Sequence, residues 1–138
     1  CFGHQMIAQA LGGEVRRSER GWGIGVQEIA ITTAEPWMQP PLTGVRMLFT
    51  HQDQVETLPP DARLIGGTAH CPHAMFAVGD HILAMQSHPE YSRRSLRALI
   101  ESREAIIAPL TFQTGPASLE QPPHREEPAA WLRHFLLA

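Results

Sequence analysis

Residues 1–13 read CFGHQMIAQALGG, and this stretch combines a cysteine with the start of a helix. Apolar residues recur at helical spacing and the glycine pair at 12–13 supplies a stop signal, so we predict a short helix directly after Cys1. A thiol just before a helix lies at the positive end of the helix dipole, which stabilises a thiolate. The N–H of Phe2 can face an oxyanion, and Gly3 permits close backbone approach. The stretch indicates a nucleophile; the alternative is a core cysteine that happens to precede a helix.

A second reactive stretch, QSHPE, occupies residues 86–90 at the end of an apolar run. Pro89 biases His88 toward an extended backbone, in which residues two apart point to the same side. The Glu90 carboxylate can therefore hold one imidazole nitrogen and leave the other to take the thiol proton. We predict a base with its orienting carboxylate; the alternative is a loop histidine beside a solvated glutamate.

Two further polar stretches are less specific. Residues 50–55 read THQDQV and follow the apolar run 46–50, so we expect the polar tip at 51–53 to be exposed. The HCPH stretch at 70–73 offers only three zinc-type ligands and has no second cluster of matching spacing, so we predict no metal site.

The rest of the pattern predicts one domain over residues 1–138. Alternating or continuous apolar runs indicate strands, and the run at 81–86 is expected to be more buried than the run at 74–78. Five prolines mark 109–128 as an irregular surface connector before a docking helix at 129–137. The remaining predicted elements are strands at 22–32 (with a bulge or turn), 46–50 and 62–65, a Gly79-Asp80 turn, and a helix at 92–107 that opens at Ser92.

Composition excludes several classes of function. The net charge is −3, from 11 basic and 14 acidic residues without long runs, so neither nucleic acid nor a membrane surface is an expected partner. No apolar stretch is long enough to span a bilayer. Two cysteines cannot build a disulfide framework, and no secretory signal is present, so we expect a cytoplasmic protein. A chain of 138 residues has no room for a fused synthase.

Taken in order, CFGHQ before a helix that ends in GG, then THQDQV with LPP, then GDHILAMQSHPEY before a helix, resemble the class I glutamine amidotransferase family. The likeness covers nearly the whole chain. It is similar to stand-alone members such as the glutaminase domain of GMP synthase and the plant gamma-glutamyl peptidases.

The resemblance implies a flavodoxin-like three-layer α/β sandwich, of which residues 1–138 are the C-terminal portion starting at the nucleophile elbow. It implies that roughly half of the sheet, including the strand that feeds the elbow, precedes Cys1. The implied catalytic triad is Cys1, His88 and Glu90. The residues implied beside the glutamyl group are Phe2, Gln5, Thr50, His51 and Gln52.

The resemblance also implies a reaction without a cofactor. Cys1 attacks the γ-amide of glutamine, His88 passes a proton to the leaving amine, and water releases glutamate from the thioester. A separate synthase subunit is the implied acceptor of ammonia. Two alternatives stay open: a gamma-glutamyl peptidase with the same triad, and a catalytically silent binding protein. A cysteine at position 1 also fits an N-terminal-nucleophile amidotransferase, but that class starts on a strand rather than a helix.

Overall fold

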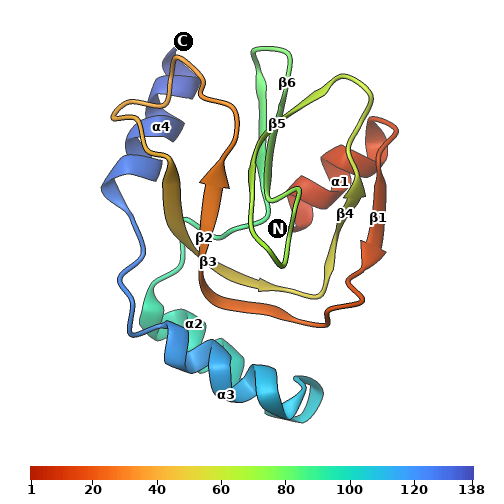
Figure 1. Ribbon diagram of the computed structural model, residues 1–138, viewed down its shortest axis with the longest axis vertical. Coiled ribbons are helices and arrows are strands. Elements are labelled where there is room, and N and C mark those ends of the chain that lie inside the picture. Colours follow the sequence, from red (N-terminus) through yellow and green to blue (C-terminus); the bar gives the residue numbers. More distant parts are fainter.

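The computed structural model describes all of residues 1–138 (Figure 1). In Figure 1, α4 lies beside β2 and β3 on one side, α1 lies next to β1 and β4 on the other, and α2 and α3 lie together below the strands. None of the helices combines the length and apolar character needed to cross a bilayer. In chain order the elements are α1 Phe2–Ala10, β1 Glu14–Arg17, β2 Gly23–Ile31, β3 Gly44–His51, β4 Asp53–Thr57, β5 Ala62–Gly67, β6 Met75–Val78, β7 Ile82–Met85, α2 Arg93–Ser102, a 3-10 turn Glu104–Ile106, α3 Pro109–Ser118 and α4 Glu126–Leu137.

All strand pairs are antiparallel. Five strands form a sheet in the order β3-β2-β5-β6-β7, and β1 pairs with β4 in a second, two-stranded sheet. The two sheets are joined by one bent hairpin, because β4 follows β3 after the single residue Gln52, and β1 and β2 run back alongside them. The N–H of Ser18 donates to the Gln52 carbonyl at 2.9 Å across the bend. The hairpin therefore turns residues 50–55 out of one sheet and into the other.

The core lies on both faces of the five-stranded sheet. One cluster, which includes Phe49 and Ile65, is closed by Trp131 of α4, whose indole N–H donates to the Pro40 carbonyl at 2.8 Å. A second cluster packs Leu96 and Ile100 of α2 against the other face. Burial of these apolar side chains supplies the main stabilisation of the sheet–helix contacts.

Several expectations about single elements are confirmed and others are wrong. The helix after Cys1, the predicted strands and the Ser92 cap are present, and Gly79 adopts φ +56° in the predicted turn. The bulge or turn predicted within residues 22–32 is wrong, because β2 pairs with β3 in unbroken register from Gly23 to Ala30. Strands β1 and β4 were not predicted. The burial order of the last two strands is reversed: β6 is almost wholly buried, whereas β7 is an edge strand with mostly half-buried residues. The 92–107 helix ends at Ser102 and continues as a 3-10 turn.

The proline-rich segment 109–128 is not an irregular connector. Pro109 starts α3 at a position where no N–H bond is needed, and Pro116 falls in the last turn, where it removes one bond only. Pro128 lies likewise in the first turn of α4, which begins three residues earlier than expected. Position within the helix, rather than the number of prolines, decides whether a helix forms.

The α/β class is confirmed, but a complete flavodoxin-like three-layer sandwich is not formed by residues 1–138. Every strand pair within them is antiparallel, and β7 has a strand neighbour on one side only. The Cys1 nitrogen lies against this strand and donates to the Met85 carbonyl at 3.2 Å. The elbow is therefore anchored at the end of an edge strand.

Candidate active site

Cys1 is the N-cap residue of α1, and its side chain makes no capping hydrogen bond. Its sulfur instead accepts a hydrogen bond from Nε2 of Gln86, at 3.1 Å. The N–H groups of the first helical turn lack intrahelical partners and create positive potential beside the sulfur. Cys1 is partly exposed, so a substrate can reach a thiol held in a setting that favours the thiolate.

His88 and Glu90 form the predicted pair. Nδ1 of His88 donates to Oε1 of Glu90 at 2.6 Å, and Tyr91 stacks on the imidazole with ring centroids 4.3 Å apart. The His88 N–H donates to the Leu48 carbonyl at 2.8 Å, which ties the loop to β3. Nε2 of His88 is buried and has no partner. The ring is thus fixed at Nδ1 and has its other nitrogen available for proton transfer.

The Glu90 carboxyl has a pKa below its ordinary value. Partial burial acts in the opposite direction, but the hydrogen bond from His88, a backbone hydrogen bond and the attraction of His88 outweigh it. Glu90 is therefore ionised at neutral pH, as an orienting carboxylate must be.

The structure brings Cys1 and the His88–Glu90 pair to the same strand end without joining them directly. Gln86 contacts the Cys1 sulfur and lies two residues before His88 along the chain. No hydrogen bond links the sulfur to Nε2 of His88, which stays unpartnered. Cys1 and the His88–Glu90 pair are therefore neighbours without a direct hydrogen bond, and the catalytic role of the three residues stays a prediction.

Of the residues expected beside the glutamyl group, three are exposed or half-buried, namely Phe2, Gln5 and Gln52, and two are buried, namely Thr50 and His51. Gln5 reaches across from α1 and donates through Nε2 to the Asp53 carbonyl at 2.6 Å and to Oε1 of Gln86 at 3.2 Å. Phe2 projects from the helix with 72% of its surface exposed. Gln52 occupies the bend of the hairpin through its carbonyl.

Thr50 and His51 are buried, so the expected exposure of the polar tip at 51–53 is wrong at its first residue. The bend carries His51 inward, where Nε2 donates to Oε1 of Gln54 at 3.3 Å. Burial, with further repulsion from neighbouring histidines, lowers the pKa of His51 to about 4. Thr50 Oγ1 accepts from Arg103 at 3.4 Å. His51 is therefore a neutral donor next to the site at physiological pH.

Sequence reasoning missed Gln54 and Gln86 as members of this network. Both are uncharged amides, and only the fold shows that they are buried against His51 and Cys1. The position of Gln86 two residues before His88 is the one signal that could have indicated a shared orientation.

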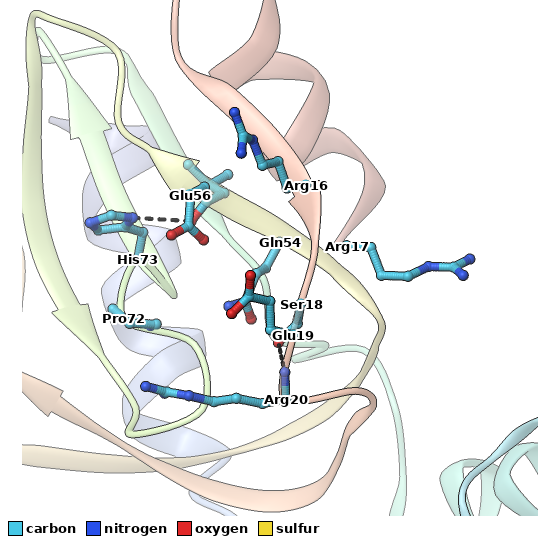
Figure 2. Close-up of a pocket in the computed structure, with 10 residues that line it drawn as sticks. Arg16, Arg17, Ser18, Glu19, Arg20, Gln54, Glu56, Pro72 and His73 are labelled. Carbon is cyan, nitrogen blue, oxygen red and sulfur yellow. Dashed lines mark hydrogen bonds between the residues drawn. The ribbon is translucent and has the colours of Figure 1, made fainter.

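A polar pocket of about 270 Å³ adjoins the network at Gln54, between β1, β4 and the loop before β6 (Figure 2). Figure 2 shows Arg17 pointing away from it, while Gln54 and Glu56 face its interior. His73 closes one side, with Nδ1 donating to the Val55 carbonyl at 3.0 Å. The pocket offers charged groups of both signs beside the hairpin bend.

The side chains of the HCPH stretch are not gathered into a cluster of metal-ligating groups. No cluster of three or more His, Cys, Asp or Glu side chains is arranged to hold an ion. Cys71 is fully buried, and burial raises the pKa of its thiol to about 12. Its N–H donates to the Thr68 hydroxyl at 2.9 Å, and within the stretch only Cys71 belongs to the core.

A cysteine at a helix N-terminus, an imidazole–carboxylate pair and an α/β fold are features that thiol-dependent hydrolases and transferases share. The sequence comparisons make the family specific: residues 1–107 match the family model of glutamine amidotransferase class-I. The chain belongs to the class I glutamine amidotransferase family.

Curated relatives include two kinds of protein. Gamma-glutamyl peptidase 2 of Arabidopsis thaliana is 35% identical over 106 residues, which cover 73% of this chain and 42% of the relative. A glutamine-hydrolyzing GMP synthase subunit of Pyrococcus furiosus is 36% identical over 91 residues, covering 65% and 48%. The chain thus spans about half the length of the curated relatives it matches.

The fold also matches a solved structure. A glutamine amidotransferase from Thermotoga maritima superposes with a TM-score of 0.73 at 24% identity, over 99% of this chain and 58% of that one. This likeness shows the fold alone.

Proposed function

We propose that the protein hydrolyses the γ-amide of glutamine through a thioester on Cys1. The observation that carries the proposal is the strand end after β7, where Gln86 contacts the Cys1 sulfur and His88 is held by Glu90 at 2.6 Å. These contacts support the assignment of Cys1 as nucleophile, His88 as base and Glu90 as the orienter of that base.

In the proposed reaction the Cys1 thiolate attacks the γ-carbonyl carbon and the carbonyl π electrons move to oxygen. Backbone N–H groups at the start of α1, including that of Phe2, stabilise the oxyanion because they have no helical partner. Nε2 of His88 delivers the proton to the leaving nitrogen, and ammonia departs as the carbonyl re-forms. Water, deprotonated by the same imidazole, then attacks the thioester and releases glutamate and the thiol.

Glu90 supports both proton transfers without giving up its own charge. It fixes the tautomer of His88 with the proton on Nδ1 and stabilises the imidazolium that forms at each step. Its lowered pKa keeps the carboxylate ionised throughout the neutral range.

We propose that Gln5, Gln52 and the buried His51 bind the substrate. The side-chain N–H groups of Gln5 donate to the Asp53 carbonyl and to Oε1 of Gln86. The Oε1 atom of Gln5 therefore remains available to accept from an ammonium group. His51 is neutral, because its pKa is about 4, and adds no charge that would repel the α-ammonium group of glutamine.

A second candidate, gamma-glutamyl peptidase activity, is supported by the likeness to the Arabidopsis thaliana peptidases and by the polar pocket beside Gln54. Such an enzyme uses the same thioester but expels a peptide amine in place of ammonia. A transferase needs an acceptor for ammonia. The likeness to the GMP synthase subunit of Pyrococcus furiosus supports a separate synthase as that partner.

The test compares substrates on the purified full-length protein and on its Cys1→Ala variant. We expect glutamine to be hydrolysed by the first and not by the second. Faster hydrolysis of γ-glutamyl dipeptides than of glutamine, again lost in Cys1→Ala, would establish the peptidase instead. No hydrolysis of any γ-glutamyl compound, with or without a co-purified synthase, would leave a silent binding protein.

A further inference from the structure

Gln86 is wholly buried at the end of β7 and is the one side chain that hydrogen-bonds to the Cys1 sulfur. Its backbone N–H donates at 2.8 Å to the carbonyl of Ala74, the residue directly before β6. Its side-chain amide has one contact at each end: Nε2 with the sulfur at 3.1 Å and Oε1 with Nε2 of Gln5 at 3.2 Å.

The direction of this chain of hydrogen bonds is determined at its outer end. The Asp53 carbonyl can only accept, so the group of Gln5 that meets it at 2.6 Å must be the NH₂. The same NH₂ meets Gln86 and therefore requires the oxygen of the Gln86 amide on that side. The NH₂ of Gln86 must then face the sulfur, because in a flipped amide the NH₂ groups of Gln5 and Gln86 would face each other and their contact would be lost.

We propose that Gln86 is a positioning residue that aims the Cys1 sulfur and stabilises its thiolate form by donating an N–H, with Gln5 and the Asp53 carbonyl holding the Gln86 amide in the donating orientation. The inference deepens the proposed function and rests on Cys1 as the nucleophile. It adds a donor to the sulfur that is independent of His88.

The side-chain N–H of Gln86 is expected to stabilise the Cys1 thiolate for three physical reasons. A hydrogen bond to an anion is stronger than one to a neutral group, so the N–H favours thiolate over thiol. Complete burial of Gln86 removes competing water and makes the interaction stronger than it would be at the surface. The amide carries no charge, so it stabilises the anion without becoming a proton donor in the reaction.

The same relay connects the substrate subsite to the nucleophile. Gln5 belongs to the proposed glutamyl subsite, and its two donated hydrogen bonds lock Gln86. Loss of the Gln5 amide therefore frees Gln86 to rotate, and Cys1 loses part of its stabilisation although Gln5 never touches the sulfur.

The experiment measures alkylation of Cys1 by iodoacetamide as a function of pH in the full-length protein, followed by mass spectrometry of the peptides. Alkylation reports the thiolate without any substrate, and the buried Cys71 is an internal comparison thiol. The variants are Gln86→Met, which keeps the length and removes the donor, Gln86→Glu, which places an anion beside the sulfur, and Gln5→Met. Gln27→Met is the matched control, because it removes a side-chain contact between β2 and Thr68, outside the site.

We expect alkylation at pH 7 to slow about tenfold in Gln86→Met and further in Gln86→Glu, with the pH midpoint moving upward in that order. Gln5→Met is expected to move the midpoint in the same direction by less, and Gln27→Met to leave it unchanged. If Gln86 had only a structural role, the pH midpoint would not rise first with loss of the donor in Gln86→Met and then further with the added negative charge in Gln86→Glu.

A wild-type midpoint in folded Gln86→Met would overturn the inference. If both Gln86 variants fail to fold, Gln5→Met decides: an unchanged midpoint there would overturn the relay. Because no substrate is involved, a protein that lacks γ-glutamyl hydrolysis but shows the shifted midpoints would refute the proposed function and leave the relay intact.

Discussion

Cys1 and Cys71 have opposite environments, and the difference explains why only one is suited to catalysis. Cys71 is fully buried with a thiol pKa raised to about 12, so it is protonated and inaccessible. Cys1 is partly exposed at a helix N-terminus and accepts an N–H from Gln86. Thiol reactivity follows the thiolate fraction and access, and both favour Cys1.

The roles assigned to His88 and Glu90 predict losses of turnover of different size when each residue is replaced. His88→Ala removes the proton carrier and is expected to lower turnover and to slow thioester formation by about 10²- to 10⁴-fold. Glu90→Gln keeps the shape but not the charge, and its loss is expected to be roughly a hundredfold smaller, since an orienting carboxylate contributes less than the base. Steady-state kinetics on the full-length variants measures both. A Glu90→Gln loss larger than that of His88→Ala would contradict the assigned roles.

Buried neutral histidines make stability depend on pH. Nε2 of His4 donates to the His73 carbonyl at 2.9 Å while Nδ1 is buried without a partner, and burial lowers the pKa to about 3. His51 has a lowered pKa of about 4. Below pH 6.5 the unfolded chain takes up these protons and the folded chain does not, so folding is most stable above pH 6.5 and weakens toward pH 3–4.

We therefore expect the free energy of unfolding to fall by up to about 1.4 kcal/mol per pH unit for each of the two histidines between pH 6 and pH 4. His4→Gln, whose amide can still donate to the His73 carbonyl, should reduce this slope. Denaturant unfolding at several pH values measures it, with the exposed His81→Gln as control. An unchanged slope in His4→Gln would show that His4 is not held neutral.

At the scale of elements, α3 is attached to β2 through two glycines. Gly25 has φ +92°, and a Cβ there would lie 2.7 Å from the Gly115 carbonyl and would overlap Ser118. A Cβ on Gly115 would lie 2.8 Å from Cγ2 of Ile24. Ser118 Oγ accepts from the Val26 N–H at 2.9 Å across the same contact. Only glycine at both positions lets helix and strand come this close.

Gly25→Ala is expected to destabilise the full-length protein by about 2 kcal/mol or more, since a left-handed conformation and a steric overlap add. Gly3→Ala is the control, because a Cβ there meets nothing within 4 Å and alanine favours a helix. Thermal unfolding compares the two variants. Equal stability of Gly25→Ala and the wild type would show that α3 does not dock on β2.

Local patterns predicted most elements because periodicity and caps are written in neighbouring residues. The helix after Cys1 and the Ser92 cap are such cases. The α3 helix was missed because its prolines lie at positions that tolerate them and its stability depends on glycine contacts with β2, which are distant in sequence.

The candidate site follows the same division. The contact of His88 with Glu90 is local and was predicted, as was the place of Cys1 before a helix. The inward turn of His51 depends on the bent hairpin, and the position of Gln86 at the sulfur depends on α1 meeting β7, so neither could be read from one stretch.

For the whole molecule, the free side of β7 and the exposed side chains of α1 indicate where further chain would pack. β7 has one strand neighbour, and Phe2 and Met6 are 72% and 55% exposed on the adjacent helix. Exposed strand edges and apolar side chains of this kind are usually covered.

In a structure of the full-length protein we expect an additional strand paired with Ile82–Met85 on this side. Hydrogen exchange offers a solution measurement, with slow exchange of the N–H groups of β7 that face the free side in this structure. Rapid exchange there, or a β7 edge open to solvent in the full-length structure, would contradict the expectation.

The most direct measurement is detection of the thioester. The full-length protein is mixed with glutamine, quenched in acid within one turnover and digested, and the peptides are analysed by mass spectrometry. We predict a glutamyl adduct on the peptide that contains Cys1, absent from Cys1→Ala and present in Cys71→Ala. Hydrolysis of glutamine with no adduct on Cys1, undiminished in Cys1→Ala, would contradict the assignment of Cys1 as the nucleophile.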